Sequence, residues 1–133
     1  MKLRRLTIPI RSEMDIAKAI LEARRASNEL GFGAPEQSRI STATSELARN
    51  IVKYAGTGQV RINQIEHNAR RGIEVIAEDN GPGIKDIDLA MKDHFSTSGT
   101  LGLGLPGVRR LMDEFNIESA KGKGTRVTVR KWR

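Results

Sequence analysis

Four short polar segments hold the residues of this chain that could do chemistry, and they follow one another in a fixed order. They are 46–50 (Glu-Leu-Ala-Arg-Asn), 79–83 (Asp-Asn-Gly-Pro-Gly), 102–104 (Gly-Leu-Gly) and 122–125 (Gly-Lys-Gly-Thr). They offer a carboxylate and an amide for metal and phosphate, an aspartate for the edge of a base, and glycines at which phosphates can approach the backbone. Because the chain lacks the Gly-Lys-Ser/Thr of a P-loop, the segments together predict a nucleotide pocket on a different scaffold.

The first segment lies on the polar face of a predicted helix. At about 100° per residue, Glu46, Arg49, Asn50 and Lys53 point to one side, opposite an apolar stripe within 40–54. Glu46 could act as a general base for an attacking hydroxyl, and the amide oxygen of Asn50, one turn later, could bind Mg²⁺. The same face is also compatible with a solvated surface supported by i,i+4 side-chain pairs.

Asp79 ends an alternating strand pattern whose inward positions fall within 73–77. The alternation places Asp79 on the core-facing side, where a carboxylate needs a hydrogen-bond partner. It could cap the turn that follows it, as in an Asx turn, or accept a hydrogen bond from the exocyclic amino group of adenine. In the second case Gly81 and Gly83 would let the backbone approach the flat base.

Glycines also precede a predicted third helix. Gly102 and Gly104 free the backbone to turn N–H groups toward an anion, and the helix dipole adds to the attraction. Residues 94–100 before them combine small hydroxyl side chains with one Phe, which favours a lid that orders on phosphate binding. In the last segment Thr125 shares a strand face with inward residues, so its hydroxyl could support Asp79, although the segment could also be only a hairpin turn.

Hydrophobic spacing predicts the elements that position these segments. The expected order is strand (6–10), helix (12–30), helix (35–55), strand (60–62), polar turn (67–72), strand (73–77), loop (84–104) with a helical turn near 86–92, helix (105–112), strand (115–117) and strand (125–129). Gly31 and Gly56 are expected to end the first two helices, and Pro35 to begin the second. The order predicts an α/β two-layer sandwich with a mixed, largely antiparallel sheet and helices on one face.

Length and composition narrow the class of protein. The 133 residues suit one domain over 1–133, and the absence of cysteine excludes disulfides and thiolate metal sites. No apolar run approaches the roughly 18 residues of a membrane span, so a cytoplasmic protein is expected. The net charge of +7 permits acidic partners, while the 4% of aromatic residues disfavours a stacking platform for single-stranded nucleic acid.

The four segments resemble the N, G1, G2 and G3 boxes of the gyrase–Hsp90–histidine kinase–MutL (GHKL) ATPase superfamily, which uses the Bergerat fold. Further stretches make the chain most similar to the stand-alone serine kinases of bacterial partner-switching pathways, and among these to the stressosome switch kinases. The stretches are 45–50, 77–84, 95–99, 104–108 and 110–115. The resemblance covers nearly the whole chain and is strongest from about Gly31 to Trp132.

The resemblance implies ATP and Mg²⁺ as cofactors. It also implies a role for each residue that matches a position in the family's motifs. Glu46 corresponds to the general base for a substrate hydroxyl, Asn50 to the Mg²⁺ ligand, and Asp79 to the residue that recognises the adenine amino group. The remaining implied cofactor-binding residues are Arg49, Lys53, Gly81, Gly83, Gly102, Leu103, Gly104, Leu105 and Thr125.

The implied substrate is a serine or threonine on a STAS-domain scaffold or antagonist protein. The implied second partner is the regulatory domain of a PP2C-type phosphatase, which the kinase would activate after leaving its scaffold. Two alternatives remain open: an anti-sigma factor with serine kinase activity, and a non-enzymatic basic binding module for nucleic acid. The kinase itself is expected to bind neither nucleic acid nor a membrane, and residues 3–6 could form an ordinary edge strand or pair across a homodimer.

Overall fold

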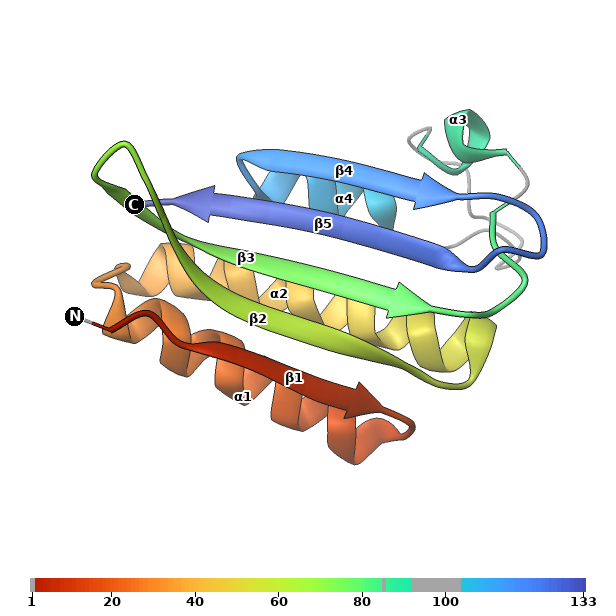
Figure 1. Cartoon of the computed structure of the whole chain (residues 1–133), viewed down its shortest axis with the longest axis horizontal. Helices are drawn as coiled ribbons and strands as arrows, with labels where there is room; N and C mark the ends of the chain where they lie inside the picture. Colours follow the sequence, from red (N-terminus) through yellow and green to blue (C-terminus); the bar gives the residue numbers. More distant parts are fainter. Residues whose placement is uncertain (1, 85, 92–103) are drawn as a thin grey trace.

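The computed structural model describes residues 2–84, 86–91 and 104–133. The elements are β1 (Arg5–Ile10), α1 (Glu13–Glu29), α2 (Ala34–Asn50), a π-helical segment η1 (Ile51–Ala55), β2 (Gly58–His67), β3 (Arg70–Asp79), α3 (Ile87–Ala90), α4 (Leu105–Leu111), β4 (Glu114–Ser119) and β5 (Thr125–Trp132). Within these ranges the strands form one sheet in the order β1-β2-β3-β5-β4, and each of its pairings is antiparallel. Figure 1 shows this sheet as one layer and α1 and α2 as the layer behind it, which confirms the predicted α/β sandwich. The expectation of a mixed sheet is corrected, since no pairing among the described residues is parallel.

Local signals set the bounds of the first two helices. Ser12 is the extended N-cap residue of α1, but Asp15 supplies the capping contact by accepting a hydrogen bond from the backbone N–H of Arg11 (2.8 Å). The helix ends at Gly31, whose φ of +87° is the left-handed conformation expected at this position. Pro35 lies in the first turn of α2, as predicted.

The end of α2 contains a feature that the sequence pattern did not predict. The predicted helix continues to Gly56, but its last turn is the π-helical segment η1, closed by a hydrogen bond from Gly56 N to Ile51 O (2.8 Å). The segment has only five residues, which is too short for hydrophobic periodicity to distinguish a π-helical turn from an α-helical one. Gly56 has a φ of +86° and ends the segment, as predicted.

The hairpin between β2 and β3 is tighter than predicted. The prediction of a polar turn over 67–72 is wrong in its extent, because only Asn68 and Ala69 lie between the strands. Both residues have a positive φ (52° and 64°). A two-residue turn in which both residues have positive φ matches the twist of two antiparallel strands. The flanking polar residues belong to the strands, where Glu66 and Arg71 form an exposed ion pair (3.1 Å).

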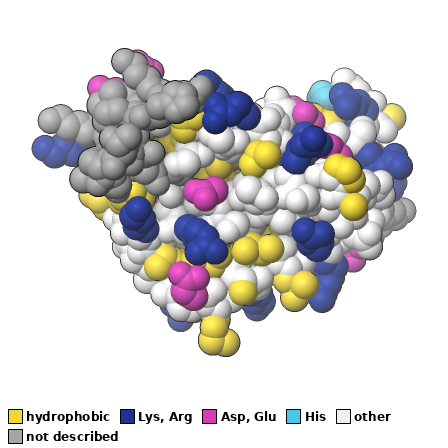
Figure 2. Space-filling model, turned by 180° about the vertical axis from the view of Figure 1, so that it is seen from behind, with side chains coloured by type: hydrophobic (Ala, Val, Ile, Leu, Met, Phe, Trp, Pro, Cys, Tyr) yellow, Lys and Arg dark blue, Asp and Glu magenta, His cyan; other side chains and the backbone are white. Residues whose placement is uncertain are grey.

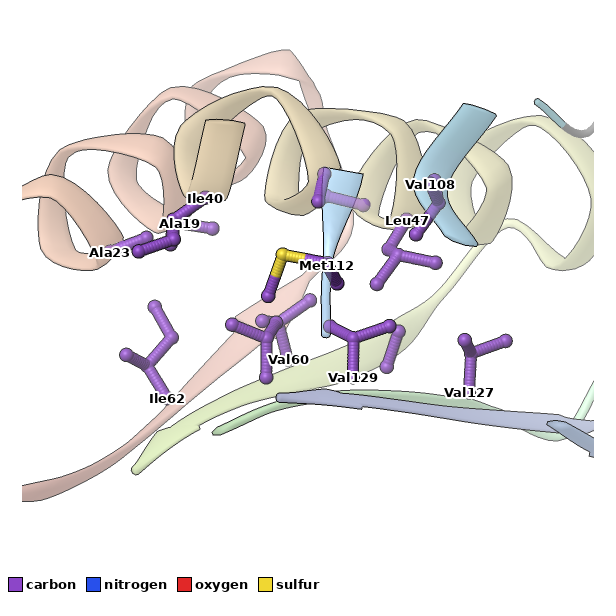
Figure 3. Packing of buried hydrophobic residues seen from close by; sticks show 14 of the residues in the cluster. Ala19, Ala23, Ile40, Leu47, Val60, Ile62, Val108, Met112, Val127 and Val129 are labelled. Carbon is purple, nitrogen blue, oxygen red and sulfur yellow. The ribbon is translucent and has the colours of Figure 1, made fainter. Parts of the chain in front are cut away.

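The core lies between the sheet and the helices. Inward residues of β2 and β5 face apolar residues of α1 and α2, and Figure 3 shows this packing. Leu47 of α2 and Val108 of α4 belong to the same buried cluster, which holds α4 on α2. The described part of the chain has no helix that is long and apolar enough to cross a membrane.

The other face of the sheet is polar. Glu74 accepts hydrogen bonds from Asn63 (3.0 Å) and Arg130 (2.8 Å), and Arg130 also reaches Glu114 (3.1 Å). A second row repeats this pattern further along the strands, with hydrogen bonds around Glu78. Paired charges of this kind keep the face hydrated, which explains why the helices cover only the opposite face.

Candidate active site

Four residues on neighbouring strands form a row at one end of the sheet. The strand register pairs Gly58 of β2 with Asp79 of β3, Asp79 with Thr125 of β5, and Thr125 with Ser119 of β4. Asp79 and Thr125 continue the buried faces of their strands, where alternate residues lie in the core. The prediction that both point inward is therefore confirmed, and the register places them side by side.

One oxygen of Asp79 holds the turn that follows the strand. Its Oδ1 accepts a hydrogen bond from the backbone N–H of Gly81 (2.9 Å), which is the Asx turn considered from the sequence. Within the described residues Oδ2 accepts no hydrogen bond. The two roles proposed for Asp79 are therefore compatible, since one oxygen can hold the turn while the other accepts from a ligand.

Asp79 lies in the wall of an open cavity of about 1000 Å³ at this end of the sheet. Gly124 and Thr125 also line it, and its charged lining residues besides Asp79 are of both signs: Arg11, Lys123, Arg126, Glu78 and Glu118. Its volume lies at the upper end of the range for small-molecule binding sites. Glu46 and Asn50 are not among its lining residues, whereas Glu78 and Arg126 of the polar face are. The cavity therefore extends over the end of the sheet and includes only the Asp79 part of the predicted site.

The glycines around Asp79 permit close backbone contacts. Gly124 has a φ of +78°, and a Cβ on it would collide with the carbonyl oxygen of Asp79. Gly83 has a φ of +75°, and a Cβ on it would collide with the carbonyl oxygen of Ala120. A Cβ on Gly81 would lie 2.6 Å from Cβ of Ala55 in η1. These contacts explain the glycines structurally, and a contact of Gly81 and Gly83 with a base stays a prediction.

Ser119 is a site residue that the sequence analysis missed. Its hydroxyl accepts a hydrogen bond from Ile84 N (2.8 Å) and lies 2.9 Å from Gly124 O and 2.8 Å from the hydroxyl of Thr125. It thus joins the loop after Asp79 to the turn before β5. The available signal was a polar residue in an inward strand position, directly before a turn rich in glycine.

The helical part of the site is built on one face of α2. Glu46 and Asn50 lie one turn apart and are half-buried. Gly104, the N-cap residue of α4, lies against Glu46: a Cβ on this glycine would be 2.5 Å from Glu46 Oε2. The structure therefore brings together three of the predicted residues from two segments that are far apart in the sequence.

Three other predicted residues lie less directly at the site. Arg49 is exposed and turns toward α1, with Nη1 3.7 Å from Glu13 Oε2. Lys53 places Nζ 5.2 Å from the ring centre of Tyr54. The side chain of Leu105 is buried in the core, so only its backbone could contribute to a phosphate site.

Two predicted residues, Gly102 and Leu103, lie outside the described residues. The proposed lid over 94–100 does so as well. Their roles stay predictions.

The sequence profile of the histidine kinase-, DNA gyrase B- and HSP90-like ATPases matches residues 36–133. The chain belongs to this ATPase family. It is 54% identical to the serine/threonine-protein kinase RsbT of Bacillus subtilis over 94% of both chains. It is also 34% identical to an anti-sigma F factor of Clostridium kluyveri, over 72% of this chain and 70% of that protein.

These similarities confirm three expectations from the sequence. The GHKL-type fold is confirmed by the ATPase family match, and the resemblance to partner-switching kinases by the identity with RsbT. The enzyme class, a serine/threonine-protein kinase, follows from the same two findings. An anti-sigma F factor of Caldanaerobacter subterraneus, 35% identical over 73% of this chain and 71% of that protein, adds a second regulatory relative.

The donor groups fit the nucleotide that the ATPase family binds. The described residues contain no group of three His, Cys, Asp or Glu side chains that could enclose a metal ion. Mg²⁺ at nucleotide sites needs no such enclosure, because one or two protein oxygens suffice beside phosphate oxygens and waters. Asn50 offers one such oxygen, and Asp79 offers an acceptor for an amino group at the other end of the site.

Proposed function

We propose that this ATPase-family member is a cytoplasmic, ATP-dependent protein serine/threonine kinase of a bacterial partner-switching pathway. The observation that supports it most is the pairing of two half-sites in one fold. Glu46 and Asn50 share a face of α2, while Asp79 lies beside Thr125 at the end of the sheet. The 54% identity with a serine/threonine-protein kinase over 94% of both chains supports the same conclusion.

Each residue would have a defined part in the transfer. Glu46 accepts the proton of the substrate hydroxyl while the hydroxyl oxygen bonds to the γ-phosphorus of ATP and ADP leaves. Asn50 would hold Mg²⁺, which would neutralise charge on the phosphates. Asp79 accepts a hydrogen bond from the adenine amino group, with Thr125 beside it.

The backbone and two cations would complete the site. Gly81 and Gly83 lie beside the base, and Arg49 and Lys53 add positive charge near the phosphates. The phosphate cradle would be formed by backbone groups of Gly102, Leu103, Gly104 and Leu105.

The substrate we propose is a STAS-domain scaffold or antagonist protein, and the second partner the regulatory domain of a PP2C-type phosphatase. On the helix-covered face, Lys and Arg side chains are more widespread than Asp and Glu, with hydrophobic side chains between them (Figure 2). An acidic protein surface would complement this face, and the association should weaken with added salt.

The outer side of α1 is the surface we propose for docking the acidic STAS-domain substrate. Met14 and Leu21, two turns apart, are the large hydrophobic residues most exposed within the described part of the chain (82% and 54%). Lys18 lies between them and is also exposed. Because Arg49 contacts Glu13, the first turn of α1 adjoins the face of α2 that carries Glu46. A protein docked on α1 would thus lie next to the proposed site of transfer.

The experiment that tests this function is transfer of labelled phosphate from Mg-ATP to a STAS-domain protein of the same genome. The wild type should label serine or threonine, and Glu46→Gln should reduce the rate by at least about 100-fold. Glu66→Gln is the matched control, because this exposed carboxylate lies by the β2–β3 turn, away from the site. Transfer that is unchanged in Glu46→Gln would contradict the proposed base.

A second candidate is an anti-sigma factor with kinase activity. The 34% identity with an anti-sigma F factor over 72% of this chain favours it. This alternative predicts that the protein retains a sigma subunit in a pull-down with ATP present. Retention of a sigma subunit would favour this alternative over the switch kinase, whereas a pull-down without any sigma subunit would contradict it.

A further inference from the structure

Gly104 and Glu46 are neighbours in space although they belong to different helical segments. Gly104 precedes α4 with a φ of +64°, and Glu46 lies in the middle of the polar face of α2. A Cβ atom on Gly104 would lie 2.5 Å from Oε2 of Glu46 and 3.1 Å from its Cδ. Cβ atoms essentially never come within 3.0 Å of a non-bonded heavy atom. Any side chain at 104 would therefore require the carboxylate to move.

The surrounding packing determines which of the two groups would move. Leu47, directly after Glu46, and Val108 of α4 are both buried in the same cluster (Figure 3). Val108 donates its backbone N–H to Gly104 O (3.0 Å), and Leu105 is 1% exposed. The backbone at 104 is therefore anchored to the core, whereas the carboxylate is the free end of a flexible side chain. A side chain at 104 would displace the carboxylate and not the helix.

We propose that Gly104 is a positioning residue for Glu46. Its missing side chain leaves the space that the Glu46 carboxylate occupies, and so fixes where the carboxylate can accept the proton of a substrate hydroxyl. This inference rests on the proposed function of Glu46 as general base. It separates Gly104 from a pure phosphate cradle, because a positioning role affects the transfer step while a cradle affects the affinity for ATP.

The substitution Gly104→Ala tests the inference, with two matched glycine controls. Gly107→Ala lies in the same helix and meets no atom within 4 Å. Gly56→Ala has a similar positive φ (+86°) and also meets open space, so it measures the cost of the left-handed backbone alone. We expect Gly104→Ala to lower kcat about 10- to 100-fold while the KM for ATP stays within about two-fold. Both controls should keep the wild-type kcat.

A double variant tests whether the effect passes through Glu46. Glu46→Asp shortens the side chain by one methylene, which relieves the closest contact with a Cβ at 104, at the present Oε2, but also retracts the base. The effect of Gly104→Ala on kcat should therefore be much smaller in the Glu46→Asp background than in the wild type. Independent, multiplicative effects would overturn the proposal. So would failure of both Gly104→Ala and the double variant to fold while Gly56→Ala folds.

Carbon-13 NMR of the labelled Glu46 carboxyl, assigned with Glu46→Gln, provides a measurement that does not depend on turnover. The resonance should shift in Gly104→Ala and stay in place in Gly107→Ala. If the wild type transfers no phosphate, the proposed function fails, while this signal still reports the contact. An unshifted resonance in Gly104→Ala, or a loss of ATP affinity at constant kcat, would overturn the positioning role.

Discussion

At the scale of single residues, Asp79 has a structural role that leaves room for the chemical role proposed for it. Asp79 holds its own turn through Gly81 and still leaves one oxygen for a ligand within the described part of the chain. Its inward direction could be predicted from strand alternation, because that signal is local. The hydrogen bonds of Ser119 could not, since its contacts with Ile84 and Thr125 depend on how β4 pairs with β5.

Ser119→Ala should loosen the Asp79 end of the site. The substitution leaves the N–H of Ile84 without its acceptor, which costs about 1–3 kcal/mol of unfolding free energy when such a group is buried. ATP affinity should fall as well, because the loop after Asp79 loses its link to Gly124. Urea denaturation and nucleotide titration measure the two effects, with Ser38→Ala, an exposed serine of α2, as control. Equal stability of both variants would contradict the role of Ser119.

At the scale of elements, caps and turns were predictable where one residue type decides them. Gly31 and Gly56 mark the ends of helical segments because glycine adopts a positive φ readily. Pro35 marks a helix start because its ring fixes φ at a helical value. The π-helical segment η1 was not predictable, because five residues are too few for hydrophobic spacing to separate it from an ordinary helical turn. The contact between α2 and α4 also escaped prediction, since it joins residues far apart in the sequence.

The proposed docking of an acidic partner on α1 leads to a prediction about charge. Lys18→Glu should raise the KM for the protein substrate about 10-fold, since a negative charge would then face the acidic partner. Lys121→Glu makes the same change of net charge on the exposed β4–β5 turn and should alter that KM by no more than about two-fold. Initial rates at several substrate concentrations measure both. Equal effects would show that net charge, not the surface of α1, governs the association.

At the scale of the whole molecule, paired carboxylates predict sensitivity to acid. The hydrogen bond from Trp132 lowers the pKa of Glu114 below its ordinary 4.5, and the hydrogen bond from Arg4 does the same for Glu29. A lowered carboxyl pKa adds stability above the unfolded value, and that stability is lost as pH falls through the folded value. The thermal midpoint should therefore drop below about pH 4.5, and less steeply in Glu114→Gln. A parallel drop in both proteins would contradict this assignment.

The overall architecture was predictable because amphipathic periodicity fixes which face of each element is buried. The largest correction concerns the β2–β3 turn, where polar residues belong to long strands and not to the loop. Sequence patterns identify solvent-facing residues well, but they do not show whether such a residue is paired across a sheet. Glu66 and Arg71 illustrate the difference.

Nucleotide selectivity tests most directly the central claim that the Asp79 end of the sheet recognises adenine. ITP carries an oxygen where ATP has its amino group, so titration of both ligands isolates the contact with Asp79. The wild type should bind ATP at least about 10-fold more tightly than ITP, and Asp79→Asn, which can keep the turn with Gly81, should lose this preference. Asp113→Asn is the matched control, because Asp113 also accepts a backbone N–H, from Trp132 at the other end of β5 (2.8 Å). An ATP preference that survives in Asp79→Asn would contradict the account.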